Sequence, residues 1–361
     1  MKPSEWEVEG TLGSGSRGKV FRARAPDGSQ WAIKVLHPDV LRSIDTDHIK
    51  TTLAQLRDAR HPAIPARAWI TDFRGDVVVI HEYVESVDLE TLATGGPIPR
   101  RAAFELCAII AEALEAVRLT PDRVGDPLGI QHGDLKPSNV LIARDGHVNI
   151  VDFGMSKVRP NAAARTLTMF HDSRGFMSPE RVDNQDSERS DLYSLGLILC
   201  YLLSGERPAQ TSAHNERHEA RREALVKSIA DVVDENEDFI LLMSRTLSYR
   251  PRDRPGLREF AQGCKQAARQ QPDDSLDEWA SRTVTAFSRS TDEVRFLDDG
   301  GRLSLAGKTP LHPGPRGRAP TPAPVPRKTR RQLSNRFWLP LIVLFALVAA
   351  AAVIGALAMA G

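Results

Sequence analysis

Four side chains suited to phosphate chemistry fall close together in the second third of the chain. Asp134, Lys136 and Asn139 lie in the segment His-Gly-Asp-Leu-Lys-Pro-Ser-Asn, and Asp152 follows in Asp-Phe-Gly. A carboxylate can accept a proton from a hydroxyl group. Carboxylate and amide oxygens are ligands that Mg²⁺ accepts, usually together with substrate phosphates. This spacing indicates a centre that acts on a metal-bound phosphate group.

A glycine-rich turn lies near the N-terminus, with Gly13, Gly15 and Gly18 followed by Val20. Glycines at this spacing let backbone N–H groups approach phosphates, because no side chain intervenes. We expect a strand after this turn rather than a helix, which disfavours a dinucleotide-binding turn. Lys34, on the next expected strand, is well placed to reach the same phosphates.

Further along the chain, Ser178-Pro179-Glu180, Asp191 and Arg254 occur in an order that completes a larger pattern. Together with the glycine turn and the acidic motifs, they resemble the eukaryotic-type (Hanks-type) serine/threonine protein kinases. The resemblance covers residues 6–268. The small number of insertions, together with the C-terminal anchor described below, favours a bacterial member.

The resemblance implies transfer of the γ-phosphoryl group of ATP, with Mg²⁺ or alternatively Mn²⁺, to serine or threonine of a protein. Asp134, Lys136 and Lys34 would be catalytic, and Asn139 and Asp152 would hold the metal. Glu82-Tyr83-Val84 would form the hinge that binds adenine. The expected nucleotide-binding residues are Leu12, Gly13, Gly15, Gly18, Val20, Ala32, Lys34, Glu82 and Val84.

Two departures from the family pattern keep other functions open. The family has a glutamate that pairs with the strand lysine, and Thr52 stands at that position here. The usual His-Arg-Asp has Gly133 in place of arginine. A nucleotide-binding pseudokinase or scaffold is therefore the main alternative. A small-molecule kinase is a weaker one, because Lys136 and the Ser-Pro-Glu, Asp191 and Arg254 set are typical of protein kinases.

The resemblance implies a fold of two lobes that hold these residues. Residues 6–84 favour strands with one helix over about 40–60, and residues 85–268 favour helices interrupted by short strands around VLIA and HVNIVDF. The predicted fold class is α+β, a two-lobed protein kinase fold with a β-rich N-lobe, a helical C-lobe and one added transmembrane helix.

The remainder of the chain has the composition of a linker followed by a membrane anchor. Residues 269–336 are polar and then proline-rich, which favours an extended juxtamembrane linker. Residues 337–360 carry no charge and are long enough to form one membrane-spanning helix. Basic residues just before this span predict a single-pass, C-terminally anchored protein with its kinase domain in the cytoplasm. Ala351 and Gly355 could allow a homodimer.

The overall charge excludes some partners. A formal net charge of +1 gives no reason to expect nucleic-acid binding. The cysteines Cys107, Cys200 and Cys264 are far apart in sequence, so we expect reduced thiols rather than disulfides or a metal site.

Overall fold

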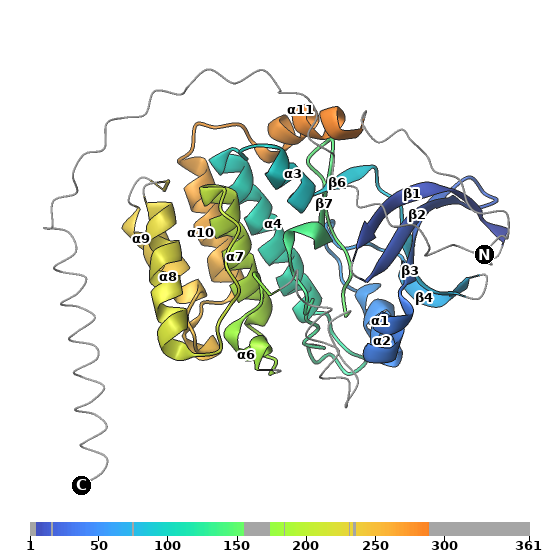
Figure 1. Cartoon of the computed structure of the whole chain (residues 1–361), viewed down its shortest axis with the longest axis horizontal. Coiled ribbons are helices and arrows are strands. Elements are labelled where there is room, and N and C mark those ends of the chain that lie inside the picture. Colours follow the sequence, from blue (N-terminus) through green and yellow to red (C-terminus); the bar gives the residue numbers. More distant parts are fainter. Residues whose placement is uncertain are drawn as a thin grey trace, which may run out of the picture. The chain divides into compact units, whose positions relative to one another are not determined.

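Alternating apolar residues in the first part of the chain build a five-stranded antiparallel sheet, seen in a computed structural model (Figure 1). The structure describes residues 5–15, 17–73, 76–154, 174–183, 185–230, 232–233 and 236–288. All of these belong to the first of two compact units, Met1–Leu311. The strand order is β1-β2-β3-β5-β4, formed by β1 Glu7–Gly15, β2 Gly18–Arg24, β3 Gln30–Leu36, β4 Ala68–Phe73 and β5 Asp76–Glu82.

Two helices, α1 Pro38–Ser43 and α2 Thr46–Leu56, lie between β3 and β4 in sequence. Asp45 begins α2, because its side chain accepts hydrogen bonds from the backbone N–H groups of Asp47 and His48. The sheet also contributes to a second apolar core, separate from the main one. In this core the rings of Trp6 and Trp31 stack with their centroids 5.1 Å apart.

The C-lobe packs around the apolar helix α7, in which every residue from Ser190 to Leu202 is buried. It contacts α4, a long helix with one buried face. The lobe's helices are α3 Leu89–Gly95, α4 Arg100–Arg118, α6 Pro179–Val182, α7 Ser190–Ser204, α8 Asn215–Ala230, α9 Glu237–Thr246, α10 Leu257–Arg269 and α11 Leu276–Ser288, with the short 3₁₀ helices η2 Pro137–Asn139 and η3 Pro251–Asp253.

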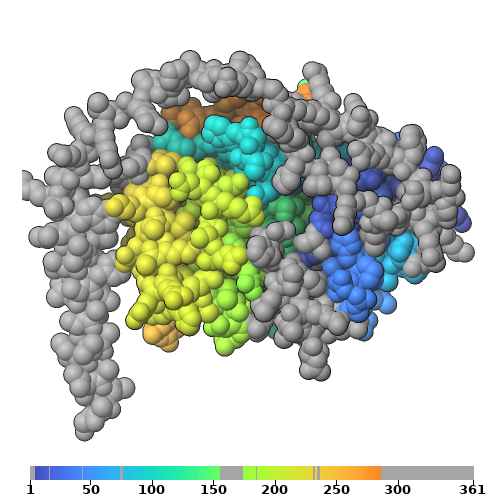
Figure 2. All heavy atoms as spheres, viewed as in Figure 1, coloured from blue at the N-terminus to red at the C-terminus, as the bar shows by residue number. Residues whose placement is uncertain are grey.

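A small antiparallel sheet, β6-β7-β8, lies at the base of the catalytic segment. It consists of β6 Ser86–Asp88, β7 Val140–Ala143 and β8 Val148–Ile150. The two predicted metal ligands lie at the two ends of the β7–β8 hairpin. Asn139 directly precedes β7, and Asp152 lies two residues after β8. In Figure 2 the blue N-lobe lies on one side of this view and the green and yellow residues of the C-lobe lie on the other.

Helical structure continues beyond residue 268, where the sequence predicted the start of a linker. Ser275 and Glu278 form a reciprocal hydrogen-bonded cap at the start of α11. Trp279 and Ala280 of this helix are buried in the main core, and α11 contacts α4, β6 and β7. The folded part of the chain therefore includes α11.

No helix within the described residues is long and apolar enough to cross a membrane. The linker from residue 289 onward and the transmembrane helix expected at 337–360 lie outside the described residues.

Candidate active site

A buried aspartate of α7 holds the catalytic segment in place. Asp191 Oδ2 accepts a hydrogen bond from the backbone N–H of His132 at 2.7 Å, and its Oδ1 accepts from that of Gly133 at 3.0 Å. Burial would raise the pKa of Asp191, but the charge of Arg181 and these hydrogen bonds lower it below its usual value. An ionised carboxylate therefore fixes the backbone just before Asp134.

His132 is fully buried and links this segment to the one that carries Asp152. Its Nε2 lies 2.8 Å from the carbonyl oxygen of Val151, and its Nδ1 lies 3.1 Å from the backbone nitrogen of Asp134. This network assigns the proton to Nε2, because the Asp134 nitrogen can only donate. Burial lowers the pKa of His132, so the ring is neutral near pH 7.

The predicted catalytic residues Asp134 and Lys136 and the predicted metal ligand Asn139 meet at one point. The Asn139 amide nitrogen donates to the carbonyl oxygen of Asp134 at 2.8 Å and to its Oδ2 at 3.2 Å. Lys136 Nζ lies 3.5 Å from the same Oδ2. Asp134 is 5% exposed, so its carboxylate is largely shielded from water while surrounded by positive charge.

Asp152 lies opposite, in the left-handed backbone region with a φ of 68°. This conformation is uncommon for a residue other than glycine and is often found at functional sites. Its carboxylate forms an ion pair with Lys34 of β3. Burial would raise the pKa of Asp152, but the charge of Lys34 and its hydrogen bond outweigh this effect and lower the pKa below its usual value. The carboxyl group is therefore ionised near pH 7.

The metal-binding prediction fits the donor atoms that are present. Asp152 offers a carboxylate, and Asn139 uses its amide nitrogen on Asp134, which leaves its amide oxygen as the atom that could bind a cation. Within the described residues, no group of three His, Cys, Asp or Glu side chains could hold a metal ion. A site with two protein ligands is typical of Mg²⁺, which keeps waters and substrate phosphates in its shell.

The glycine turn forms the hairpin between β1 and β2, as its sequence predicted. A Cβ atom added to Gly18 would lie 1.9 Å from the carbonyl oxygen of Val35, so only glycine fits against β3 there. Gly13 and Gly15 have no neighbouring atom within 4 Å of such a Cβ, which leaves their backbone accessible. Leu12, on the same hairpin, is 41% exposed.

The expected nucleotide-facing residues of the sheet lie in register. Val20 pairs with Lys34 across β2 and β3, and Ala32 pairs with His81 across β3 and β5. The hinge follows β5, where the Tyr83 backbone N–H donates to the carbonyl of Gln30 at 3.1 Å.

The two hinge residues that the sequence assigned to adenine binding differ in their contacts. The side chain of Glu82 pairs with Arg67, while the carbonyl oxygen of Val84 accepts a hydrogen bond from the Ser86 hydroxyl at 2.8 Å.

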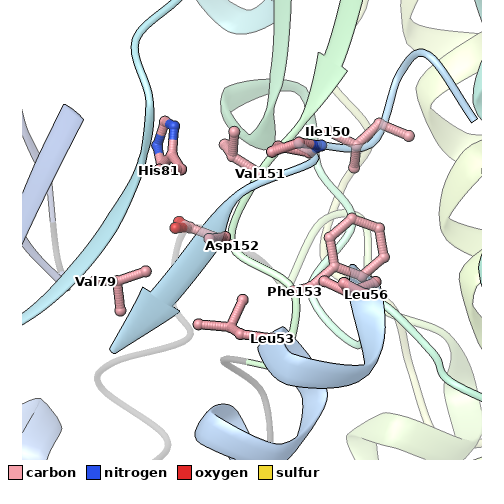
Figure 3. A pocket seen from close by; sticks show the side chains of 10 residues that line it. Leu53, Leu56, Val79, His81, Ile150, Val151, Asp152 and Phe153 are labelled. Carbon is pink, nitrogen blue, oxygen red and sulfur yellow. The ribbon is translucent and has the colours of Figure 1, made fainter. Parts of the chain in front are cut away.

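Behind the Lys34–Asp152 pair lies a narrow apolar pocket (Figure 3). Figure 3 shows Asp152 between β5, which carries Val79 and His81, and α2, which carries Leu53. Burial lowers the pKa of His81, so this ring is neutral. The pocket lies between the sheet and α2. Helix α2 is the element on which the family pattern places a glutamate.

Thr52 occupies the position on α2 that faces the acidic motif. It is 3% exposed, and a Cβ on Gly154 would lie 3.1 Å from its Cβ. Its hydroxyl lies 3.3 Å from Nε2 of His48. The only acidic residue within α2 is Asp47, in its first turn. Lys34 therefore pairs with Asp152 in this structure and not with an acid of the helix.

The end of the Ser-Pro-Glu motif is fixed by a buried ion pair. Glu180 and Arg254 form two hydrogen bonds of 2.7 Å, and the Ser190 hydroxyl donates to Glu180 at 2.6 Å. The Arg254 side chain is fully buried. Burial would raise the pKa of Glu180, but Arg254 lowers it below its usual value.

Two arginines of the site were not singled out from the sequence. Arg181 Nη1 lies 2.9 Å from Asp191 Oδ1, and its Nη2 donates to Gln131 at 3.1 Å. Arg17 of the glycine turn lies 2.6 Å from Asp134 Oδ2. Each stands beside a motif position, but a single arginine in sequence has no periodicity that would distinguish it from a solvated one.

Comparison with known proteins agrees with this geometry. Residues 6–265 match the protein kinase domain family. The solved structure of the Mycobacterium tuberculosis PknI kinase domain is similar, with a TM-score of 0.54 and 20% identity over 74% of this chain and 97% of that one. At this identity the likeness supports the fold alone.

Curated relatives include the serine/threonine-protein kinase pkn2 of Myxococcus xanthus, 35% identical over 209 residues, which are 55% of this chain and 24% of pkn2. The CBL-interacting protein kinase 21 of Oryza sativa subsp. japonica is 29% identical over 216 residues, covering 58% of this chain and 39% of the relative. The chain thus spans less than half the length of these relatives.

The match over residues 6–265 covers most of the chain, and so this chain belongs to the protein kinase family. Its two-lobed fold, with a β-sheet N-lobe and a helical C-lobe, is the one that the sequence predicted.

Proposed function

We propose that the chain is an ATP-dependent serine/threonine protein kinase that uses Mg²⁺. The observation that carries this proposal is the grouping of five side chains: Lys34 pairs with Asp152, and Lys136 and Asn139 contact Asp134. The charge of Lys136 also lowers the pKa of Asp152, so the two groups lie close together. The names of the matched relatives, among them a serine/threonine-protein kinase of Myxococcus xanthus, support the same acceptor class.

In this mechanism Asp134 orients the acceptor hydroxyl and takes its proton while the hydroxyl oxygen bonds to the γ-phosphorus. The bond from that phosphorus to the bridging oxygen breaks, and ADP leaves with the bond's electron pair. Lys136 neutralises charge on the group in transfer, and Lys34 binds the phosphates that remain on ADP. Asn139 and Asp152 would hold Mg²⁺, which supplies charge neutralisation on the phosphate oxygens.

The test uses the purified full chain with labelled ATP, Mg²⁺ and a generic protein acceptor. We expect label on serine and threonine, and a decrease of roughly 10²- to 10⁴-fold in Asp134→Asn, which removes the proton acceptor while keeping the shape. Replacement of Mg²⁺ by Mn²⁺ tests the alternative metal. Nucleotide binding without transfer by the unmodified chain would support a pseudokinase, and transfer to small alcohols alone would support a small-molecule kinase.

We further propose that the chain is anchored in a membrane by residues 337–360, with the kinase domain in the cytoplasm. The uncharged 25-residue end of the sequence and the basic residues before it support this proposal. Membrane fractionation of cells that express the full chain, or a chain ending at residue 336, tests it. The full chain should sediment with membranes and resist extraction by high salt, and the shortened chain should not.

Association through Ala351 and Gly355 is the corresponding proposal for a homodimer. Replacing both residues by leucine should reduce crosslinking between two differently tagged copies in the membrane. Unchanged crosslinking would mean that this pair of small residues makes no contribution.

A further inference from the structure

Arg17 is the feature of the site that the mechanism above does not use. It lies between Gly15 and Gly18 at the tip of the glycine hairpin, yet it is only 4% exposed. Its guanidinium reaches across the site, and Nη1 lies 2.6 Å from Oδ2 of Asp134. The glycine hairpin of the N-lobe is therefore joined by an ion pair to the proposed proton acceptor of the C-lobe.

The backbone of the hairpin is held in place by His37. The backbone N–H of His37 donates to the carbonyl oxygen of Arg17 at 3.0 Å. The ring of the same histidine lies 3.2 Å from the carbonyl oxygen of Gly15. Two contacts from the start of α1 thus fix the backbone on either side of the turn, so the reach of Arg17 into the site has a structural basis.

The ion pair competes with phosphoryl transfer. Oδ2 of Asp134 contacts Arg17, Lys136 and Asn139, and the acceptor hydroxyl has to approach this carboxylate. Release of Asp134 by Arg17 would give the hydroxyl room. A buried guanidinium is strongly unfavourable without an anion close to it. The charge of Arg17 also lowers the pKa of Asp152, but the mechanism assigns that carboxylate to Mg²⁺, so Arg17 needs a further anion when it leaves Asp134.

The terminal phosphate of ATP is the anion that arrives at this place, because the hydroxyl held by Asp134 attacks it. Arginine matches phosphate oxygens with two parallel hydrogen bonds. The sequence predicts that the glycine hairpin, which carries Arg17, binds the phosphates, so the arginine would need to move only a short way. We propose that Arg17 is a further nucleotide-binding residue, which holds Asp134 when the site lacks nucleotide and transfers to the γ-phosphate of bound ATP.

This inference rests on the proposed use of ATP and has a specific consequence. Only a nucleotide with a γ-phosphate can take Arg17 from Asp134, so Arg17 should contribute to the binding of ATP but not of ADP. A residue that merely blocked the site would weaken both nucleotides equally, and a merely structural residue would affect neither differentially.

The experiment measures the dissociation constants of a non-hydrolysable ATP analogue and of ADP, each with Mg²⁺, for the full chain. We expect Arg17→Met to reduce the ratio of analogue affinity to ADP affinity by about tenfold, the size expected for a charge-assisted hydrogen bond. Arg17→Lys, which keeps the charge, should restore part of this ratio. Lys19→Met is the matched control, because it removes a cation two residues further along the same hairpin. The ratio of the two affinities should not change in this variant.

The outcomes separate this inference from the function on which it rests. An equal gain in affinity for both nucleotides in Arg17→Met, or an unchanged ratio, would overturn the inference while leaving the kinase proposal intact. Failure of the unmodified chain to bind either nucleotide would overturn both. A single cooperative thermal unfolding transition of Arg17→Met shows that the variant is folded.

Discussion

Lys34 has an ion-pair partner in this structure, but the partner is Asp152 and not an acid of α2. In the proposed mechanism Lys34 binds phosphates and Asp152 holds Mg²⁺, so the nucleotide and the metal would compete with the direct pair between the two side chains. A second acidic side chain that pairs with Lys34 would leave the Asp152 carboxylate available for Mg²⁺. Thr52 is the residue where such an acid can be introduced.

We expect Thr52→Glu to increase kcat/KM severalfold, because its carboxylate would compete with Asp152 for Lys34. Thr52 is buried against Gly154, so the larger side chain also has a packing cost. Thr52→Gln has nearly the same shape without the charge and is the control. Equal rates for the two variants would show that the missing acid does not limit the reaction.

Arg181 connects the Ser-Pro-Glu segment to the catalytic segment through Asp191 and Gln131. We expect Arg181→Met to lower kcat by about 10- to 100-fold, since Asp191 then loses a buried positive partner and holds the backbone before Asp134 less firmly. The affinity for nucleotide should change little, because Arg181 contacts no expected nucleotide-binding residue. Steady-state kinetics with varied ATP tests this, and a change confined to KM would contradict it.

At the level of single residues, the sequence predicts those that belong to spaced motifs. The β7–β8 hairpin separates Asn139 from Asp152 by a fixed length of chain, and the Asn139 side chain contacts Asp134 five residues earlier. Arg17 could not be predicted in this way, since the reach of a long side chain across two lobes depends on how the lobes close. Sequence spacing contains no information on that closure.

At the level of elements, the buried pair between Glu180 and Arg254 joins α6 to the segment before α10. Removing one charge of a buried pair leaves the other uncompensated, so Glu180→Gln should lower the free energy of unfolding by about 3–5 kcal/mol. The exposed pair of Arg245 and Glu259 is the control, since Glu259→Gln should cost at most about 1 kcal/mol. Urea unfolding of the full chain measures both, and similar losses would refute the distinction.

Helix α11 is the element that the sequence analysis assigned to a linker. Its apolar residues Leu276, Trp279, Ala280 and Val284 form one face at helical spacing, but charged and polar residues surround them. Such a face predicts a helix without showing whether the domain offers a surface for it. That surface, on α4 and the β6–β7 strands, exists only in the folded molecule.

If α11 belongs to the folded domain, Trp279→Ala should lower the free energy of unfolding by about 3–5 kcal/mol, because it leaves a cavity in the core. Ser281→Ala, on the exposed side of the same helix, is the control and should have little effect. Thermal or urea unfolding measures the difference. A loss below about 1 kcal/mol for the tryptophan variant would mean that α11 is only loosely attached.

At the level of the whole molecule, the buried titratable groups determine how stability depends on pH. Burial lowers the pKa of His61, His81 and His132 below the usual 6.5. Between that value and the lowered one, the unfolded chain binds more protons than the folded chain. Stability should therefore decrease as pH falls below about 6.5. A second decrease should follow below about 4.5, where the lowered pKa values of Glu180 and Asp191 act in the same direction.

His132→Gln isolates one of these contributions, since the amide offers a donor and an acceptor but does not titrate. The free energy of unfolding of the unmodified chain should fall by up to about 1.4 kcal/mol per pH unit more steeply than that of the variant between pH 6.5 and pH 5, the slope for one proton. His214→Gln, which removes an exposed histidine instead, is the control. Parallel curves for His132→Gln and the unmodified chain would show that protonation of His132 does not oppose folding. The mechanism predicts the opposite, because a protonated ring could no longer accept the hydrogen bond from Asp134 that sets the proposed proton acceptor in place.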